Sequence, residues 1–179
     1  MIRLHLCCGD VYLKGYVNID RVGVPPPKGY KGTTLDKYFK GKTIKKRGKV
    51  YVDRLQDIAS YYNCAKGWGY ECNSIDEIVM INGIEHFDLF EARGIIRDIK
   101  TILKPNGKFL VDFPDIGNIG MMADKEWQVR LLYGSETNPH KWGYTKDTFL
   151  KLLGNGWNVK FRDIVKHDYP STGVEATKK

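Results

Sequence analysis

An unbroken apolar run, followed by an amphipathic segment and a second apolar run, constrains the fold more than any other feature. The run lies in residues 75–82, where positions 78–81 are all apolar, as expected for a strand covered on both faces. Over residues 88–103 apolar side chains recur three and four positions apart, which predicts a helix with Asp88 as its N-cap. A turn at 104–107 leads into a strand at 108–113. This order predicts a parallel α/β sheet.

Two more short strands are expected near the N-terminus, at residues 2–6 and 16–20. Only about ten residues separate them, whereas a parallel crossover usually needs a dozen or more. The first helix must therefore be very short or replaced by a loop. Residues 50–53 predict a third strand, and residues 55–62 predict a short helix after it.

The C-terminal part predicts two further helices and two further strands. A helix is expected at 125–132, inside a region rich in Gly and Met, and another is expected from the Thr145 cap to Leu153. A strand at 157–165 is followed by a final strand at 174–177 that pairs with it. We expect one domain over residues 1–179, with a mostly parallel Rossmann-like sheet, an antiparallel C-terminal strand and an abbreviated first helix.

Length and composition indicate a globular domain. The 179 residues suffice for one sizeable core, and no apolar run approaches the roughly 18 residues that span a bilayer. The N-terminus enters a strand directly, so we expect no signal peptide, a cytoplasmic location and no membrane contact. None of the four cysteines has a C-x-x-C spacing, which favours buried thiols over a metal site, and we expect no metal.

The excess positive charge lies in one segment. The chain has 29 basic and 21 acidic residues, a formal net charge of +8. Residues 28–49, from Lys28 to Lys49, hold nine basic residues and one acid, Asp36, so this basic segment alone accounts for the net charge. It lies in a region of about residues 22–49 that includes the triplet Pro25–Pro27 and reads as an insertion.

Polar residues and glycines follow the predicted strands at the points where the strands end. Parallel sheets bind ligands at the carboxyl ends of their strands, so these groups are expected to meet. Gly9 allows a close backbone approach to a ligand, and the carboxylate of Asp20 can accept hydrogen bonds from two ribose hydroxyls. The groups are Cys7, Cys8, Gly9 and Asp10 after the first strand, Asp20 after the second, Asp53 after the third, and Asn82 and Gly83 after the fourth.

Four motifs resemble the compact class I S-adenosylmethionine (SAM)-dependent methyltransferases of the type 11-like group. They read LHLCCGDVYLKGYVNID at 4–20, NSIDEIVMINGIEHF at 73–87, ILKPNGKFLVDFPD at 102–115 and WGYTKDTFLKLL at 142–153. They occur in the family's order and cover nearly the whole chain outside the insertion. The resemblance implies a Rossmann-like class I methyltransferase fold, with SAM as cofactor.

The resemblance also implies which residues contact the cofactor. The loop formed by Cys7, Cys8, Gly9 and Asp10 would face the methionine part, and Asp20 would hold the ribose. Asp53 and the backbone of Arg54 would read adenine. Asn82 and Gly83 would line the side of the sulfonium. The chain departs from the family pattern at three positions: Cys7 replaces the first glycine, His5 replaces an acid and Asn82 replaces a histidine.

Methyl transfer asks little of the protein, because the sulfonium is already reactive and placement of the acceptor supplies much of the rate. A general base helps when the acceptor is a hydroxyl. The candidates are His86, His140, Asp115 and Tyr144, although His86 also suits a polar cap on the following helix and His140 a plain loop position. We expect methylation of an O or N of a small-molecule or glycan-like acceptor.

An alternative function remains open. The basic segment, interleaved with Tyr30, Tyr38 and Phe39, suits either a solvated loop or an anionic ligand such as nucleic acid or another polyanion. A catalytically weak methyltransferase-like module would then bind polyanions with an affinity that falls steeply with salt. A nicotinamide-binding fold fits less well, because G-x-G-x-x-G is absent. The sequence makes no prediction of oligomeric state.

Overall fold

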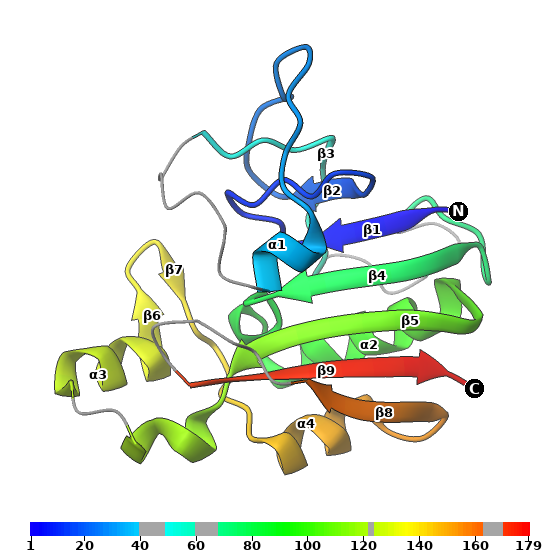
Figure 1. Cartoon of the computed structure of the whole chain (residues 1–179). Coiled ribbons are helices and arrows are strands. Elements are labelled where there is room, and N and C mark those ends of the chain that lie inside the picture. The colour runs from blue at the N-terminus through cyan, green and yellow to red at the C-terminus, as the bar shows by residue number, and fades with distance from the viewer. Residues whose placement is uncertain (40–48, 60–67, 122–123, 163–169) are drawn as a thin grey trace.

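The chain folds around one central sheet (Figure 1). The computed structural model describes residues 1–39, 49–59, 68–121, 124–162 and 170–179. Within these residues seven strands form the sheet, in the order β3-β2-β1-β4-β5-β9-β8. The strands are β1 (Arg3–Leu6), β2 (Val17–Asp20), β3 (Arg54–Leu55), β4 (Ile75–Ile81), β5 (Leu103–Pro114), β8 (Trp157–Arg162) and β9 (Ser171–Lys178).

The sheet is mostly parallel. Strands β3, β2, β1, β4 and β5 pair in parallel, whereas β9 runs antiparallel to both of its neighbours, β5 and β8. Strand order reverses between β1 and β4, where crossovers leave the sheet in opposite directions. The expected α/β fold with an antiparallel C-terminal strand is confirmed.

Helices cover both faces of the sheet. Helix α2 (Leu89–Ile102) and helix α4 (Lys146–Leu153) pack on one face, and their apolar residues form the larger core with those of β1, β4 and β5. Asp88 and Thr145 cap these helices through capping boxes, as expected for Asp88 and Thr145 from the sequence. The short helix α1 (Leu35–Phe39) lies on the other face, over a smaller core around Val79, Ile81 and Leu110.

A small subdomain extends beyond the carboxyl ends of the parallel strands (Figure 1). It holds two short 3₁₀ helices, η1 (Ile84–His86) and η2 (Ile116–Met121), helix α3 (Lys125–Tyr133) and a hairpin of β6 (Gly134–Ser135) and β7 (Asn138–Pro139). The helix predicted at 125–132 is confirmed as α3. The hairpin was not predicted.

Several predicted boundaries are wrong. The third strand is Arg54–Leu55 rather than 50–53, because only these residues pair with β2. Residues 55–59 form no helix, and 60–62 lie outside the described residues. The turn at 104–107 interrupts β5 instead of preceding it, since Leu103 already pairs with Ile75 before the register shifts. The strand predicted at 157–165 ends at Arg162 in β8, and 163–165 lie outside the described residues.

A loop replaces the first helix, as the short spacing predicted. Asn18, which is fully buried, holds this loop against the sheet. Its side-chain oxygen accepts hydrogen bonds from the Leu13 amide (2.8 Å) and from His5 Nδ1 (3.0 Å). Its side-chain nitrogen donates to the carbonyls of Leu13 (3.0 Å) and Tyr16 (3.1 Å). One amide side chain thus supplies the partners that a helix would otherwise provide for this backbone.

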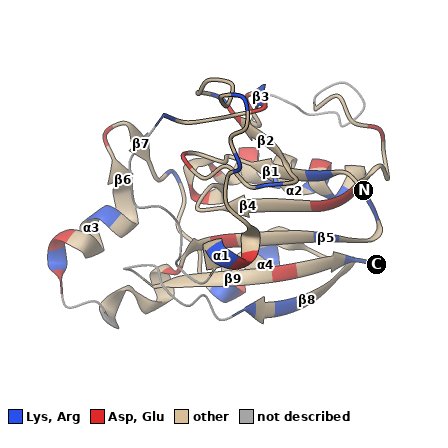
Figure 2. Cartoon of the chain, turned by 45° about the horizontal axis from the view of Figure 1, so that its top comes forward, with Lys and Arg blue, Asp and Glu red and all other residues tan. Residues whose placement is uncertain are grey.

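The described part of the basic segment is exposed to solvent. Lys28, Lys31, Lys37 and Lys49 are exposed, whereas residues 40–48, which carry the other five basic residues, lie outside the described residues. Elsewhere acidic and basic residues lie close together, as on α3 and on the neighbouring strands β8 and β9 (Figure 2). Among the described residues no helix has the length and apolar character that crossing a membrane requires.

We predict that Asn18→Ala lowers the free energy of unfolding by about 3 kcal/mol. The substitution leaves buried donors and acceptors of the loop unpaired, each at a cost of about 1–3 kcal/mol. Asn158, which is exposed on β8, provides the matched control, and Asn158→Ala is expected to change stability by no more than about 0.5 kcal/mol. Urea unfolding monitored by tryptophan fluorescence measures both. Equal effects of the two substitutions would contradict the proposed role of Asn18.

Candidate active site

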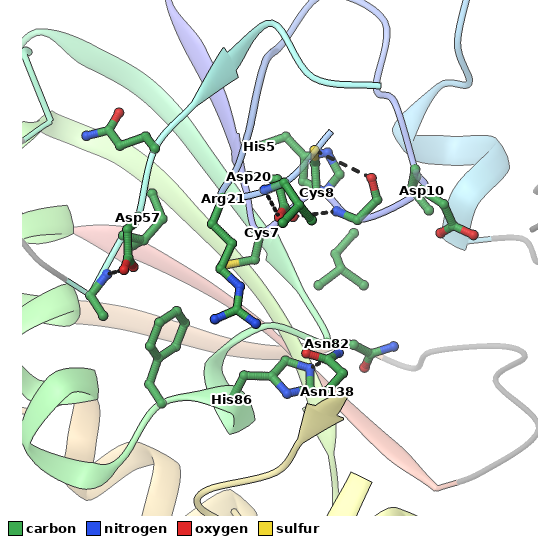
Figure 3. A pocket seen from close by; sticks show the side chains of 18 of the residues that line it. His5, Cys7, Cys8, Asp10, Asp20, Arg21, Asp57, Asn82, His86 and Asn138 are labelled. Carbon is green, nitrogen blue, oxygen red and sulfur yellow. Dashed lines mark hydrogen bonds between the residues drawn. The ribbon is translucent and has the colours of Figure 1, made fainter. Parts of the chain in front are cut away.

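A cavity of about 610 Å³ lies at the carboxyl ends of β1, β2 and β4. This volume is in the range of small-molecule and cofactor sites. Figure 3 shows Cys7, Cys8 and Asp20, from the ends of β1 and β2, on one side of the cavity. Asn82, from the end of β4, lies beside His86 and Asn138 on the opposite side. Predicted residues that line it are Cys7, Cys8, Gly9, Asp10, Asp20, Asn82 and His86.

Asp20 fixes the loop after β1. One carboxylate oxygen accepts a hydrogen bond from the Gly9 amide at 2.9 Å, and the other accepts from the Val22 amide at 3.3 Å. A carboxylate has about four acceptor positions, so two of them can still face the cavity. The end of β2 is therefore tied to the turn after β1, and both form one wall of the cavity (Figure 3).

Two neighbouring strand ends carry non-glycine residues in the left-handed region. Cys7 has a φ of 52° after β1, and Asn82 has a φ of 46° after β4. Such conformations cost about 1–3 kcal/mol each and cluster at functional sites. Gly83 makes room between them, because a Cβ there would lie 3.0 Å from the Cβ of Cys7 and 2.9 Å from Met80. Gly83 itself does not line the cavity, but its lack of a side chain positions Cys7.

The two cysteines of the loop are protonated thiols. Burial is the main cause that raises the pKa of both, and the nearby carboxylate of Asp20 adds to the effect. A thiolate is the nucleophilic form of cysteine, so neither Cys7 nor Cys8 is suited to nucleophilic catalysis. Their place in the cavity wall is consistent with contact to a ligand.

Asp53 and Arg54 lie outside the lining of the cavity, in contrast to the sequence-based expectation. The carboxylate of Asp53 accepts hydrogen bonds from the Tyr12 hydroxyl (2.6 Å) and the Asn18 amide (2.9 Å), and so supports the loop of Asn18. The Arg54 guanidinium donates to the carbonyl of Trp68 (2.7 Å). Residues 56–59, which include Asp57, line the cavity in their place. The shifted position of β3 explains this difference.

His86 lies at the far wall of the cavity. Its Nδ1 donates to the carbonyl of Pro139 (3.0 Å), and its Nε2 accepts from the amide of Asn138 (3.0 Å). Burial is the main cause that lowers its pKa, and His140 and Arg21 contribute. The imidazole is therefore neutral at pH 7 and can accept a proton.

The other predicted catalytic residues do not line the cavity. His140 lies behind His86, with the ring centroids 5.0 Å apart, and its Nδ1 donates to the Leu131 carbonyl. Asp115 is buried and accepts from Thr172, Gly117 and Asn118. Tyr144 is also buried, and burial raises the pKa of its hydroxyl. The hydrogen bonds of Asp115 and the burial of Tyr144 place both side chains in the interior, away from the cavity lining.

Several parts of the cavity wall were not predicted from the sequence. Arg21 extends into the cavity between Asp20 and His86 (Figure 3). Residues 137–139 and Lys141 reach it from the β6–β7 hairpin and the following segment. Lys141 also forms an ion pair with Glu91 of α2 (3.0 Å). For Arg21 the available signal was its position directly after Asp20, the carboxylate expected to bind ribose. The β6–β7 hairpin has no apolar periodicity and so gave no signal in the sequence.

Comparisons with solved structures identify the fold. A SAM-dependent methyltransferase of Methanosarcina mazei is 14% identical, with a TM-score of 0.57 over 98% of this chain and 91% of that one. Magnesium protoporphyrin IX methyltransferase of Synechocystis with bound SAM is 12% identical, with a TM-score of 0.52 over 100% and 70%. The CurJ carbon methyltransferase is 14% identical, with a TM-score of 0.56 over 99% and 48%.

The chain therefore has the fold of the class I SAM-dependent methyltransferases, as its motifs predicted. Neither a protein family model nor a curated protein sequence matches it. At these identities the similarity defines the fold, and the chemistry has to be inferred from the cavity.

We predict that His5 lowers stability as the pH falls from about 6.5 toward 4. Burial lowers the pKa of His5 to about 4, whereas in the unfolded chain it titrates near 6.5. In this window the unfolded chain binds a proton that the folded chain does not, so stability falls by up to about 1.4 kcal/mol per pH unit. Denaturant unfolding at pH 7 and pH 5, in the wild type and in His5→Asn, measures the effect. An equal pH dependence in both proteins would refute it.

Proposed function

We propose that the chain is a SAM-dependent methyltransferase that acts on an O or N of a small-molecule or glycan-like acceptor. The observation that carries the proposal is the cavity at the carboxyl ends of β1, β2 and β4, which joins the loop of Gly9, the carboxylate of Asp20 and the strained Asn82. In an open parallel sheet this edge is where nucleotide-like ligands bind.

The cofactor end of the proposed site consists of the strand ends. The loop of Cys7, Cys8 and Gly9 faces the methionine part, and Asp20 accepts from the ribose hydroxyls. Asn82 lies on the sulfonium side, with Gly83 behind it. For adenine, Asp57 and its neighbours replace the expected Asp53 and Arg54, because only the former line the cavity. SAM would supply an activated methyl group there.

The acceptor end lies toward His86 and the β6–β7 hairpin. His86 is neutral and lines the cavity, so it can take a proton from an acceptor hydroxyl or amine. Arg21, Asn138 and Lys141 offer hydrogen-bond donors, which suit an acceptor rich in oxygen. His140 lies behind His86 and can affect proton transfer only through its contact with the His86 ring. Two of the structural neighbours are named for different acceptors, magnesium protoporphyrin IX and carbon. The acceptor proposed for this chain therefore rests on the residues that line the cavity.

We predict that Asp20→Asn weakens binding of SAM and of S-adenosylhomocysteine about 10- to 100-fold. The amide retains the shape of the side chain but loses the charge that strengthens hydrogen bonds to the ribose. Asp147→Asn, an exposed change in the first turn of α4, is the matched control and should leave binding unchanged. Titration calorimetry measures all three proteins. If the wild type binds neither compound, the proposed function is wrong.

We predict that Gly9→Ala and Gly154→Ala both lower stability, but that only Gly9→Ala weakens SAM binding. Both glycines have positive φ, 51° and 69°, and at both positions an added Cβ would meet no protein atom within 4 Å. Gly9→Ala should therefore cost about 1–2 kcal/mol of stability. Gly154→Ala should cost at least as much, because its φ of 69° is combined with a ψ of −163°, a conformation essentially confined to glycine. Only Gly9 lines the cavity, so only Gly9→Ala should weaken SAM binding, by about tenfold or more. Equal affinities of the two variants would place the cofactor elsewhere.

The alternative of a polyanion-binding module rests on the basic segment. Its four described lysines are exposed, and Tyr30 packs against Tyr12 and Tyr51 instead of lying free for stacking. Heparin binding that is lost when Lys42, Lys45, Lys46 and Arg47 become Ala, in a chain that does not bind SAM, would favour this alternative over methyl transfer.

A further inference from the structure

Glu85, His86 and His140 form a cluster beside the cavity, and the proposed methyl transfer does not use Glu85. One nitrogen or oxygen ligand atom of each residue lies within 4.8 Å of those of the other two. Glu85 and His86 belong to η1, and His140 follows β7. The carbonyl of Glu85 accepts from the amides of Lys141 (2.8 Å) and Trp142 (3.2 Å), which holds the two segments together.

The hydrogen bonds of the two imidazoles leave a lone pair on the same nitrogen, Nε2, of each ring, and on His86 this lone pair accepts from the Asn138 side-chain amide. Nδ1 of His86 donates to the carbonyl of Pro139, and Nδ1 of His140 donates to the carbonyl of Leu131. Each ring therefore carries its proton on Nδ1 and a lone pair on Nε2. A backbone carbonyl that accepts from the second ring nitrogen is the usual outer-shell partner of a metal-binding histidine.

Glu85 contributes a carboxylate that its own surroundings do not satisfy. The residue is only 2% exposed, and its Oε2 is buried without a hydrogen-bond partner among the described residues. Its Oε1 lies 4.0 Å from Nε2 of His86. A buried carboxyl oxygen without a partner is costly, and a bound cation would satisfy it.

We propose that Glu85, His86 and His140 bind a divalent first-row transition metal ion such as Zn²⁺. Two imidazoles and one carboxylate are a donor set that suits zinc, with a fourth position left open. That position can face the cavity, because His86 lines it. This metal site differs from the sequence-based expectation of no metal, which was argued from the cysteines.

Two local adjustments accompany binding. Tetrahedral zinc with bonds of about 2.0–2.1 Å holds its ligand atoms about 3.4 Å apart, so the three side chains have to approach one another by about 1 Å. The Asn138 amide, which donates to Nε2 of His86, also has to give up this contact to the metal. His86 and Asn138 line the cavity, and His86 is 20% exposed, whereas Glu85 and His140 lie behind the lining.

A metal on Nε2 of His86 would occupy the lone pair that otherwise takes a proton, so metal binding and proton transfer by His86 are alternatives. Neither involves the strand ends proposed to hold SAM, and the metal site is tested without cofactor or methylation assay. The whole chain, stripped of metal with a chelator, is titrated with Co²⁺ and followed by its visible absorption, and Zn²⁺ is then added in competition. We expect saturable binding of one Co²⁺ per chain, with the spectrum of nitrogen and oxygen ligands, and displacement by Zn²⁺. Glu85→Gln, His86→Gln and His140→Gln should each weaken binding at least about tenfold.

Glu91→Gln is the matched control. Glu91 also lines the cavity, but it lies outside the cluster, and glutamine can keep its capping contact with Asp88. We expect this variant to bind Co²⁺ like the wild type. Circular dichroism checks that each variant is folded. If Glu85→Gln does not fold, the affinity of His140→Gln tests the proposal, because His140 is only half-buried. Absence of saturable binding, a thiolate-type spectrum, or unchanged affinity in His140→Gln would overturn the proposal.

Discussion

The cavity depends on one buried amide side chain, that of Asn18. About ten residues are too few for a helical crossover between β1 and β2, so the connecting backbone must find its hydrogen bonds elsewhere. Asn18 supplies them from within β2, and it also binds His5 of β1 and receives the support of Asp53. The loop that carries Gly9 is thereby fixed to two strands at once. The carboxylate of Asp53, which was expected to bind adenine, instead accepts hydrogen bonds from Tyr12 and Asn18 and so stabilises this loop.

The second constraint is the close approach of the ends of β1 and β4. Cys7 and Asn82 both adopt left-handed backbone conformations that glycine adopts without strain. Gly83 provides the missing space at the next position, since a side chain there would collide with Cys7. Gly83 thus provides space where the ends of β1 and β4 meet, whereas the family pattern has its glycine in the loop after β1, at the position of Cys7. The strain lies in the cavity wall, as expected where geometry serves binding more than stability.

Periodic segments were predictable and irregular ones were not. The helix from Asp88 and the strand before it follow from spacing alone, because both bury apolar faces in the larger core. Strand β3 has only two residues, at the sheet edge, and one of them is the charged Arg54, so the sequence contains no periodic signal for its position. Because the strand was predicted too early, Asp53 was wrongly expected at its end. The β6–β7 hairpin depends on Gly134, which has a positive φ. A side chain at this position would collide with the backbone of Asn138 and His140. Its contribution to the cavity is a tertiary contact that spacing does not encode.

The two ends of the cavity have different physical origins. The strand ends are set by the sheet, whose parallel order brings Gly9, Asp20 and Asn82 together whatever ligand is bound. The opposite wall is set by hydrogen bonds between η1 and the segment after β7. The carbonyls of Pro139 in β7 and Leu131 in α3 accept from Nδ1 of His86 and His140 and so hold both rings in one tautomer. Burial keeps both imidazoles neutral by lowering their pKa, so this wall can accept a proton or donate lone pairs. Under the proposed function, the chemistry of the acceptor would therefore depend on the hairpin and not on the sheet.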